Sequence, residues 1–147
     1  MNILITSAGR RVELVKEFKE RLELLLPESL VFTTDLCPDY SAACHVSDAS
    51  FLAPRVTDPS YPEFLIDLCV REKISLIIPT IDTELQVLAD IKDKFAQHNI
   101  SIISCSSEFV SRCRDKRKTY LLYDQLGINY PAVYSSENLT FPVFCKP

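Results

Sequence analysis

Glycine is scarce in this sequence. Only Gly9 and Gly127 occur among 147 residues. A dinucleotide-binding fingerprint, GxGxxG, needs three closely spaced glycines so that a pyrophosphate can approach the backbone. The first small-residue turn, TSAGRR at residues 6–11, has only one of them. Close pyrophosphate binding at this turn is therefore not expected.

Long apolar runs and long runs of like charge are also missing. No apolar run approaches the ~20 residues that span a bilayer, and the N-terminus lacks the basic-then-apolar layout of a signal peptide. We therefore expect a cytoplasmic protein with no membrane partner. Sixteen basic and twenty acidic residues, without a long run of either sign, give a net charge of −4. This balance argues against a nucleic-acid surface, which needs clustered Lys and Arg.

Metal and nucleophile signatures are absent as well. The six cysteines form no CxxC pair, so we expect reduced, structural thiols rather than a zinc site or disulfides. His45 and His98 are the only histidines, and neither has a visible nucleophile partner for a catalytic dyad. The sequence names no catalytic residue and no metal ligand.

The apolar content, 47%, is enough for a compact domain with a real core. Residues 2–6 form a short branched run typical of a strand buried in a parallel sheet. A segment of helical periodicity follows and stops at Pro27. Further strands are predicted at residues 30–34, 74–78 and 100–105, with a short edge strand at 44–46. This alternation predicts an α/β fold, a Rossmann-like parallel sheet with helices on both faces.

Helix boundaries are predicted from capping patterns. Ser60 to Glu63 and Thr83 to Gln86 match capping boxes. Residues 107–126 are predicted to be helical in two pieces, with Gly127 as the C-cap. The final FPVFCKP, residues 141–147, is predicted to be a strand. Because a domain rarely ends on an apolar strand with an unpaired edge, we expect a truncated chain, or partner strands from another segment.

Polar residues follow the predicted strands at one edge of the sheet, where ligands of such folds bind. A tight turn before a helix offers N–H groups to an anion, and arginine adds bidentate donors. The predicted substrate-binding residues are Ser7, Gly9, Arg10, Arg11, Asp35, Asp82 and Glu84.

Each of these assignments has an alternative. Gly9 is also explained by the turn alone, with both arginines solvated. Asp82 and Glu84 either bind a substrate ammonium group or cap a helix. Asp35 invites a ribose-binding interpretation, but without the glycine fingerprint we favour a turn or substrate-side residue.

Four motifs in this order carry a family resemblance: TSAGRR, PTIDTEL, RDKRKTYLLYDQLGINYP and FPVFCKP. Together they resemble the ATP-grasp superfamily, specifically carbamoyl-phosphate-synthase-like carboxylate–amine ligases. The resemblance spans essentially the whole chain. It implies a Rossmann-like pre-ATP-grasp domain at residues 1–112. Residues 113–147 would be a connecting helix and the first strands of a truncated ATP-grasp small subdomain.

The resemblance also implies chemistry. Lys116 and Lys146 would contact the phosphates of ATP, and the choice of Lys116 over Lys118 rests on the neighbouring Asp115. The Mg²⁺ ligands are expected outside this fragment, which would be inactive alone. The partners would be a small-molecule carboxylate and an amine, joined through an acyl phosphate.

Two other function classes stay open. One is a standalone Rossmann-like module that binds a nucleotide through Gly9 and Asp35. The other is an α/β interaction module that forms a homodimer through its terminal strand.

Overall fold

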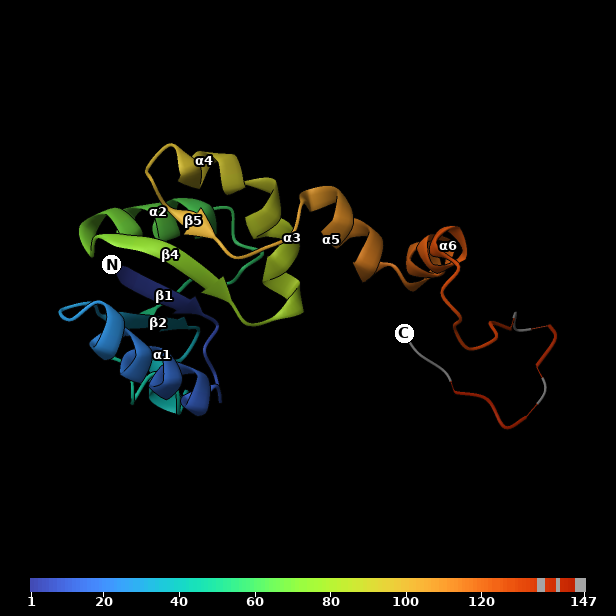
Figure 1. The fold of residues 1–147 in the computed structure, drawn as a ribbon, viewed down its shortest axis with the longest axis horizontal. Helices are drawn as coiled ribbons and strands as arrows, with labels where there is room; N and C mark the ends of the chain where they lie inside the picture. Colours follow the sequence, from blue (N-terminus) through green and yellow to red (C-terminus); the bar gives the residue numbers. More distant parts are fainter. Residues whose placement is uncertain (135–136, 140, 145–147) are drawn as a thin grey trace. The chain divides into compact units, whose positions relative to one another are not determined.

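The computed structural model describes residues 1–134, 137–139 and 141–144 (Figure 1). Packing divides the chain into two compact units, Met1–Ser111 and Arg112–Pro147. In the described part of the chain, no helix is long and apolar enough to cross a membrane.

The first unit is built on a five-stranded, all-parallel sheet. Its spatial order is β3-β2-β1-β4-β5, so the direction of strand addition reverses at β1. The strands are β1 (Asn2–Thr6), β2 (Val31–Asp35), β3 (Ala49–Leu52), β4 (Ile74–Pro79) and β5 (Ser101–Ile102). The predicted α/β fold is confirmed, although the strand expected at 100–105 is reduced to two residues.

Helices cover both faces of this sheet (Figure 1). They are α1 (Val12–Leu25), α2 (Tyr61–Arg71), α3 (Asp82–Asp90) and α4 (Lys92–Ala96), with a short 3₁₀ turn, η1, at Pro38–Tyr40. Because side chains alternate along a strand, Ile3 and Ile5 of β1 pack with Val15 of α1. Leu4 faces the other way. It belongs to a second cluster, which also contains Leu65 of α2, Leu88 of α3 and Phe95 of α4.

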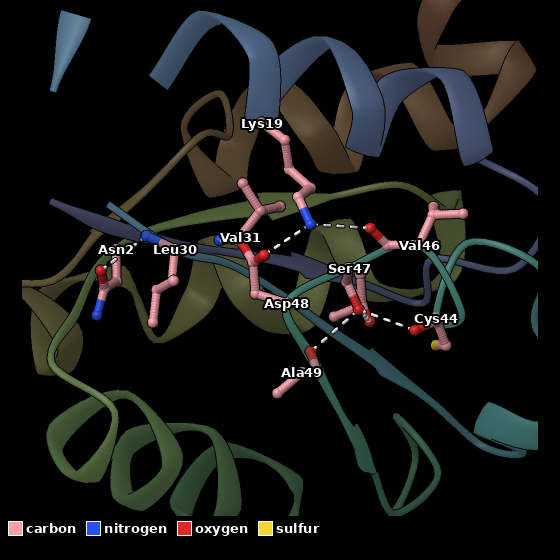
Figure 2. A network of polar contacts seen from close by, with 10 residues as sticks. Asn2, Lys19, Leu30, Val31, Cys44, Val46, Ser47, Asp48 and Ala49 are labelled. Carbon is pink, nitrogen blue, oxygen red and sulfur yellow. Dashed lines mark hydrogen bonds and ion pairs between the residues drawn. The ribbon is translucent and has the colours of Figure 1, made fainter. Parts of the chain in front are cut away.

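The edge strand lies at Ala49–Leu52, so the prediction of a strand at 44–46 is wrong. Residues 44–46 form a turn, in which the Val46 N–H donates to the Ala43 carbonyl at 3.3 Å. Ser47 Oγ donates to the Cys44 carbonyl at 2.9 Å (Figure 2). These local bonds use the backbone groups that a strand would offer to its neighbour.

A polar network holds the amino-terminal ends of the strands together (Figure 2). Asp48 Oδ2 accepts a hydrogen bond from the Val31 N–H at 2.8 Å, and its Oδ1 lies 2.6 Å from Lys19 Nζ. Lys19 also donates to the Val46 carbonyl at 3.3 Å. Asn2 Oδ1 accepts a hydrogen bond from the Leu30 N–H at 3.0 Å. This network joins α1 to the loop before β3, at the edge opposite the expected site.

The two helical pieces predicted at 107–126 are present as α5 (Ser107–Arg114) and α6 (Lys116–Leu126). The predicted C-cap is confirmed, since Gly127 has a left-handed φ of +66°. Of the strand predicted at 141–147, residues 141–144 show no strand, and the rest lies outside the described residues.

Candidate functional site

A cavity of about 220 Å³ opens at the carboxyl edge of the sheet. Residues that follow four strands contribute to its wall: Ser7 after β1, Asp35 at the end of β2, Arg55 after β3 and Ile81 after β4. Carboxyl ends of parallel strands meet at one edge, and the strand order reverses at β1, which is where ligands of such sheets bind. Two of the predicted site residues, Ser7 and Asp35, line this cavity.

The turn after β1 is tied to the end of β2. The Gly9 N–H donates to Asp35 Oδ2 at 2.8 Å, and the Cys37 N–H donates to Asp35 Oδ1 at 3.3 Å. Gly9 has a φ of +50°, a left-handed conformation that glycine adopts without strain. The Gly9 N–H, predicted to receive an external anion, therefore already donates to a carboxylate of the chain itself, and Asp35 stabilises this turn.

Glu84 lies beneath the cavity wall and is 0% exposed. Its Oε2 accepts hydrogen bonds from Ser7 Oγ at 3.0 Å and from the Tyr61 hydroxyl at 3.1 Å. Its Oε1 accepts from the N–H groups of Thr80 at 2.8 Å and Ile81 at 3.2 Å. A buried carboxylate is tolerated only when it is well hydrogen-bonded. Of the two alternatives for Glu84, these contacts favour capping of α3.

The two predicted capping boxes do not form. Ser60 precedes α2, but its backbone is helical and its hydroxyl makes no cap bond. Ser60 instead donates from both its N–H and its hydroxyl to Asp58 Oδ1, and the backbone hydrogen bond is the main cause that lowers the pKa of Asp58. At α3, the carboxylate that reaches back to the N-cap belongs to Glu84, not to Gln86.

Tyr61 lines the cavity and was missed by the sequence interpretation. Burial raises the pKa of its hydroxyl, and the charge of Glu84 raises it further. The hydroxyl is therefore a neutral donor to Glu84 at ordinary pH.

Arg10, Arg11 and Asp82, three of the predicted substrate-binding residues, do not line the cavity. Arg11 is exposed, and its Nη2 donates to the Thr80 carbonyl at 3.2 Å. Arg10 and Asp82 are exposed, and their side chains make no hydrogen bond or ion pair with any other described residue.

Arg55 and Thr57 line the cavity but were not predicted. They belong to the loop that follows β3. Because that strand was predicted at 44–46, the residues after Leu52 were not identified as the carboxyl end of a strand. The apolar residues Ala49, Phe51 and Leu52, with Pro54 shortly after them, are the signal that would have located this loop.

In the second unit, Lys116 is the first residue of α6 and is exposed. Its neighbour Asp115 pairs with Arg117, with 2.8 Å between Oδ2 and Nη2. This side-chain hydrogen bond is the main cause that lowers the pKa of Asp115 to about 2. Asp115, on which the choice of Lys116 over Lys118 rests, therefore forms its ion pair with Arg117. Lys146 lies outside the described residues.

Metal ligands are not grouped in the described residues. None of their His, Cys, Asp and Glu side chains form a set of three or more that could hold a metal ion.

A family model described as "PylC-like, N-terminal domain" matches residues 3–103. No curated protein matches the sequence. The predicted resemblance to ATP-grasp enzymes is confirmed at the level of family and fold, as a pre-ATP-grasp domain.

Solved structures share the fold at low sequence identity. The biotin carboxylase domain of a single-chain bacterial carboxylase has a TM-score of 0.61 and 16% identity, over 96% of this chain and 32% of that one. Glycinamide-RNase-transformylase T from Mycobacterium tuberculosis has a TM-score of 0.60 and 15% identity, over 86% of this chain and 36% of that one. The biotin carboxylase subunit of pyruvate carboxylase has a TM-score of 0.57 and 12% identity, over 86% and 28%. This chain thus spans about a third of the length of each of these three structures.

Proposed function

The chain belongs to the family of PylC-like N-terminal domains, and on that basis we propose that it is the N-terminal part of an ATP-dependent carboxylate–amine ligase. The family match over residues 3–103 is the observation that carries this proposal. The activity belongs to a longer protein, and the 147-residue chain is not expected to turn over by itself.

The proposed reaction has two steps. A substrate carboxylate oxygen attacks the γ-phosphorus of ATP, ADP leaves, and an acyl phosphate forms. An amine nitrogen then attacks the acyl carbon, inorganic phosphate leaves, and an amide results. The first step depends on positioning and charge neutralisation more than on covalent help from the protein.

Residues of this chain would contribute binding and orientation. The cavity at the carboxyl edge would receive a substrate. Arg10 and Arg11, both exposed beside the first turn of α1, would draw an anionic substrate toward this edge of the sheet by long-range attraction. Lys116 stands at the amino end of α6, where a helix terminus and an ammonium group together suit a phosphate. We propose the same phosphate contact for Lys146.

Mg²⁺ would accompany ATP, but the residues at the cavity do not suit a metal. Asp35 is the carboxylate that lines it, and both of its oxygens accept backbone hydrogen bonds. We therefore place the Mg²⁺ ligands elsewhere in the longer protein.

A standalone nucleotide-binding module is less well supported. Asp35 and the Gly9 N–H are bonded to each other, so neither is available to a ribose or a pyrophosphate. The cavity, about 220 Å³, is also smaller than the roughly 300–1,000 Å³ typical of drug-sized ligand sites.

Phosphate release by the product of the complete gene tests the proposal. We expect ATP-dependent release that requires Mg²⁺, a carboxylic acid and an amine. K146A and K116A should each lower kcat/KM about tenfold or more, because each removes a charged phosphate contact. K118A is the matched control and should stay near wild type. A folded product that releases no phosphate with any acid of a broad panel would overturn the ligase assignment.

A further inference from the structure

The cavity wall is apolar over much of its area. Leu36, Ala53, Pro54, Val56 and Ile81 contribute to it. The neutral polar groups are hydroxyls, on residues such as Thr57 and Thr83. Such a wall favours the apolar body of a ligand and fixes its orientation with a few polar contacts.

Arg55 is the positively charged residue of the cavity wall. It lines the cavity, is exposed, and makes no side-chain hydrogen bond or ion pair with any other described residue. The acidic groups nearby are already committed, since Asp35 is held by two backbone N–H groups and Glu84 by four donors. Among the described residues, the cavity wall therefore has an unpaired cation, Arg55, whereas the Asp35 carboxylate already accepts two hydrogen bonds from the chain.

From these contacts we infer that the cavity binds a small monocarboxylic acid with an apolar side chain, and that Arg55 anchors its carboxylate. A guanidinium holds a carboxylate through two parallel hydrogen bonds. Both oxygens of Asp35 already accept a backbone N–H, so an ammonium group on the ligand would gain less there than the carboxylate gains at Arg55. This inference names the acid substrate of the proposed ligase and rests on that function.

The size of the cavity agrees with a small acid. Its volume of about 220 Å³ equals the space of about seven water molecules at ~30 Å³ each. Isovalerate has the branched apolar body and single carboxylate that such a space accepts.

Titration calorimetry of the 147-residue chain tests the inference with three matched probes. Isovalerate carries the carboxylate, isovaleramide is its neutral analogue, and valine adds an ammonium group. We expect saturable binding of isovalerate in the millimolar range. Isovaleramide should bind at least about tenfold more weakly because it has no carboxylate to pair with Arg55. Valine should also bind at least about tenfold more weakly because its ammonium group must be desolvated. Failure of isovalerate to bind, or equal binding of the three probes, would overturn the inference.

Substitution of Arg55 identifies the anchor. R55M should weaken isovalerate binding about tenfold or more, whereas R55K should keep part of it, since lysine retains the charge without the bidentate geometry. R21M, on the exposed face of α1, is the control and should bind like the wild type. Urea unfolding of R55M verifies that it folds. Unchanged binding by folded R55M would overturn the assignment of Arg55.

These measurements use neither ATP nor an amine, so they separate the two proposals. A complete gene product that releases phosphate with acids, from a chain that does not bind isovalerate, would overturn only the substrate assignment. Specific isovalerate binding by a protein without ligase activity would overturn only the proposed function.

Discussion

Ser7 and Glu84, 77 residues apart in sequence, are joined by a hydrogen bond of 3.0 Å between Ser7 Oγ and Glu84 Oε2. Thr80 strengthens the same junction, because its hydroxyl lies 2.7 Å from the Ser7 carbonyl oxygen. Ser7 has a φ of +50°, which is uncommon for a residue with a side chain. These bonds hold the turn after β1 against the turn after β4 and so fix one wall of the cavity.

Replacement of Glu84 by leucine should lower the free energy of unfolding by about 3 kcal/mol or more, because the N–H groups of Thr80 and Ile81 and the hydroxyls of Ser7 and Tyr61 would all lose their acceptor. E84Q should cost less, since the amide oxygen can still accept. Equilibrium unfolding in urea measures both effects. Glu63, exposed in the first turn of α2, supplies the control, and E63L should stay within about 0.5 kcal/mol of wild type. Equal losses for E84L and E63L would contradict the anchoring role of Glu84.

Removal of the Asp35 carboxylate should loosen the turn after β1. D35A leaves the N–H groups of Gly9 and Cys37 without their acceptor, and we expect a loss of about 1–3 kcal/mol in unfolding free energy. The Gly9 amide should also exchange its hydrogen faster. D67A, on the exposed face of α2, is the comparison. If the Gly9 amide is equally protected in D35A and D67A, the Asp35 contact does not hold the turn.

The start of α6 should be sensitive to acid. The hydrogen bond from Arg117 lowers the folded pKa of Asp115 from 3.8 to about 2. A carboxyl group with a lowered folded pKa stabilises the fold fully above its unfolded pKa, and this contribution is lost as the pH falls through the folded value. The Arg117 backbone amide resonance should therefore be constant above about pH 4 and shift with a midpoint near pH 2, the folded pKa of Asp115.

D115N is the control for this titration. Asparagine also caps helices but carries no carboxyl group, so its Arg117 resonance should not change over the same pH range. An identical pH response in D115N and wild type would show that another group causes the shift.

The main helices and strands were predictable because their signals are local. The branched run of β1 and the apolar spacing of α1 are readable within a few residues. The two-residue strand β5 and the edge strand β3 gave weaker signals. β3 is four residues long and alternates between half-buried and exposed positions, so its periodic signal is short, and Cys44 and Val46 in the preceding turn also favoured a strand.

Capping was predicted less well, for a physical reason. Thr83 and Gln86 have the residue types and spacing of a capping box, but Glu84 also reaches the Ile81 N–H. Its carboxylate gains two further donors, from Ser7 and Tyr61. These two hydrogen bonds cannot be predicted from a local sequence pattern, because Ser7 and Tyr61 are distant from Glu84 in the chain.

The sequence by itself determined the alternation of strands and helices, and its motifs indicated the family, since periodicity and motif order are properties of neighbouring residues. Only the tertiary structure decided which polar groups are free. The strand order β3-β2-β1-β4-β5 brings Gly9 to Asp35 and Ser7 to Glu84, and these pairs satisfy one another. The same order brings the loop after β3 to the cavity and leaves Arg55 as its available cation, because hydrogen-bond partners are set by proximity in space and not by spacing in sequence.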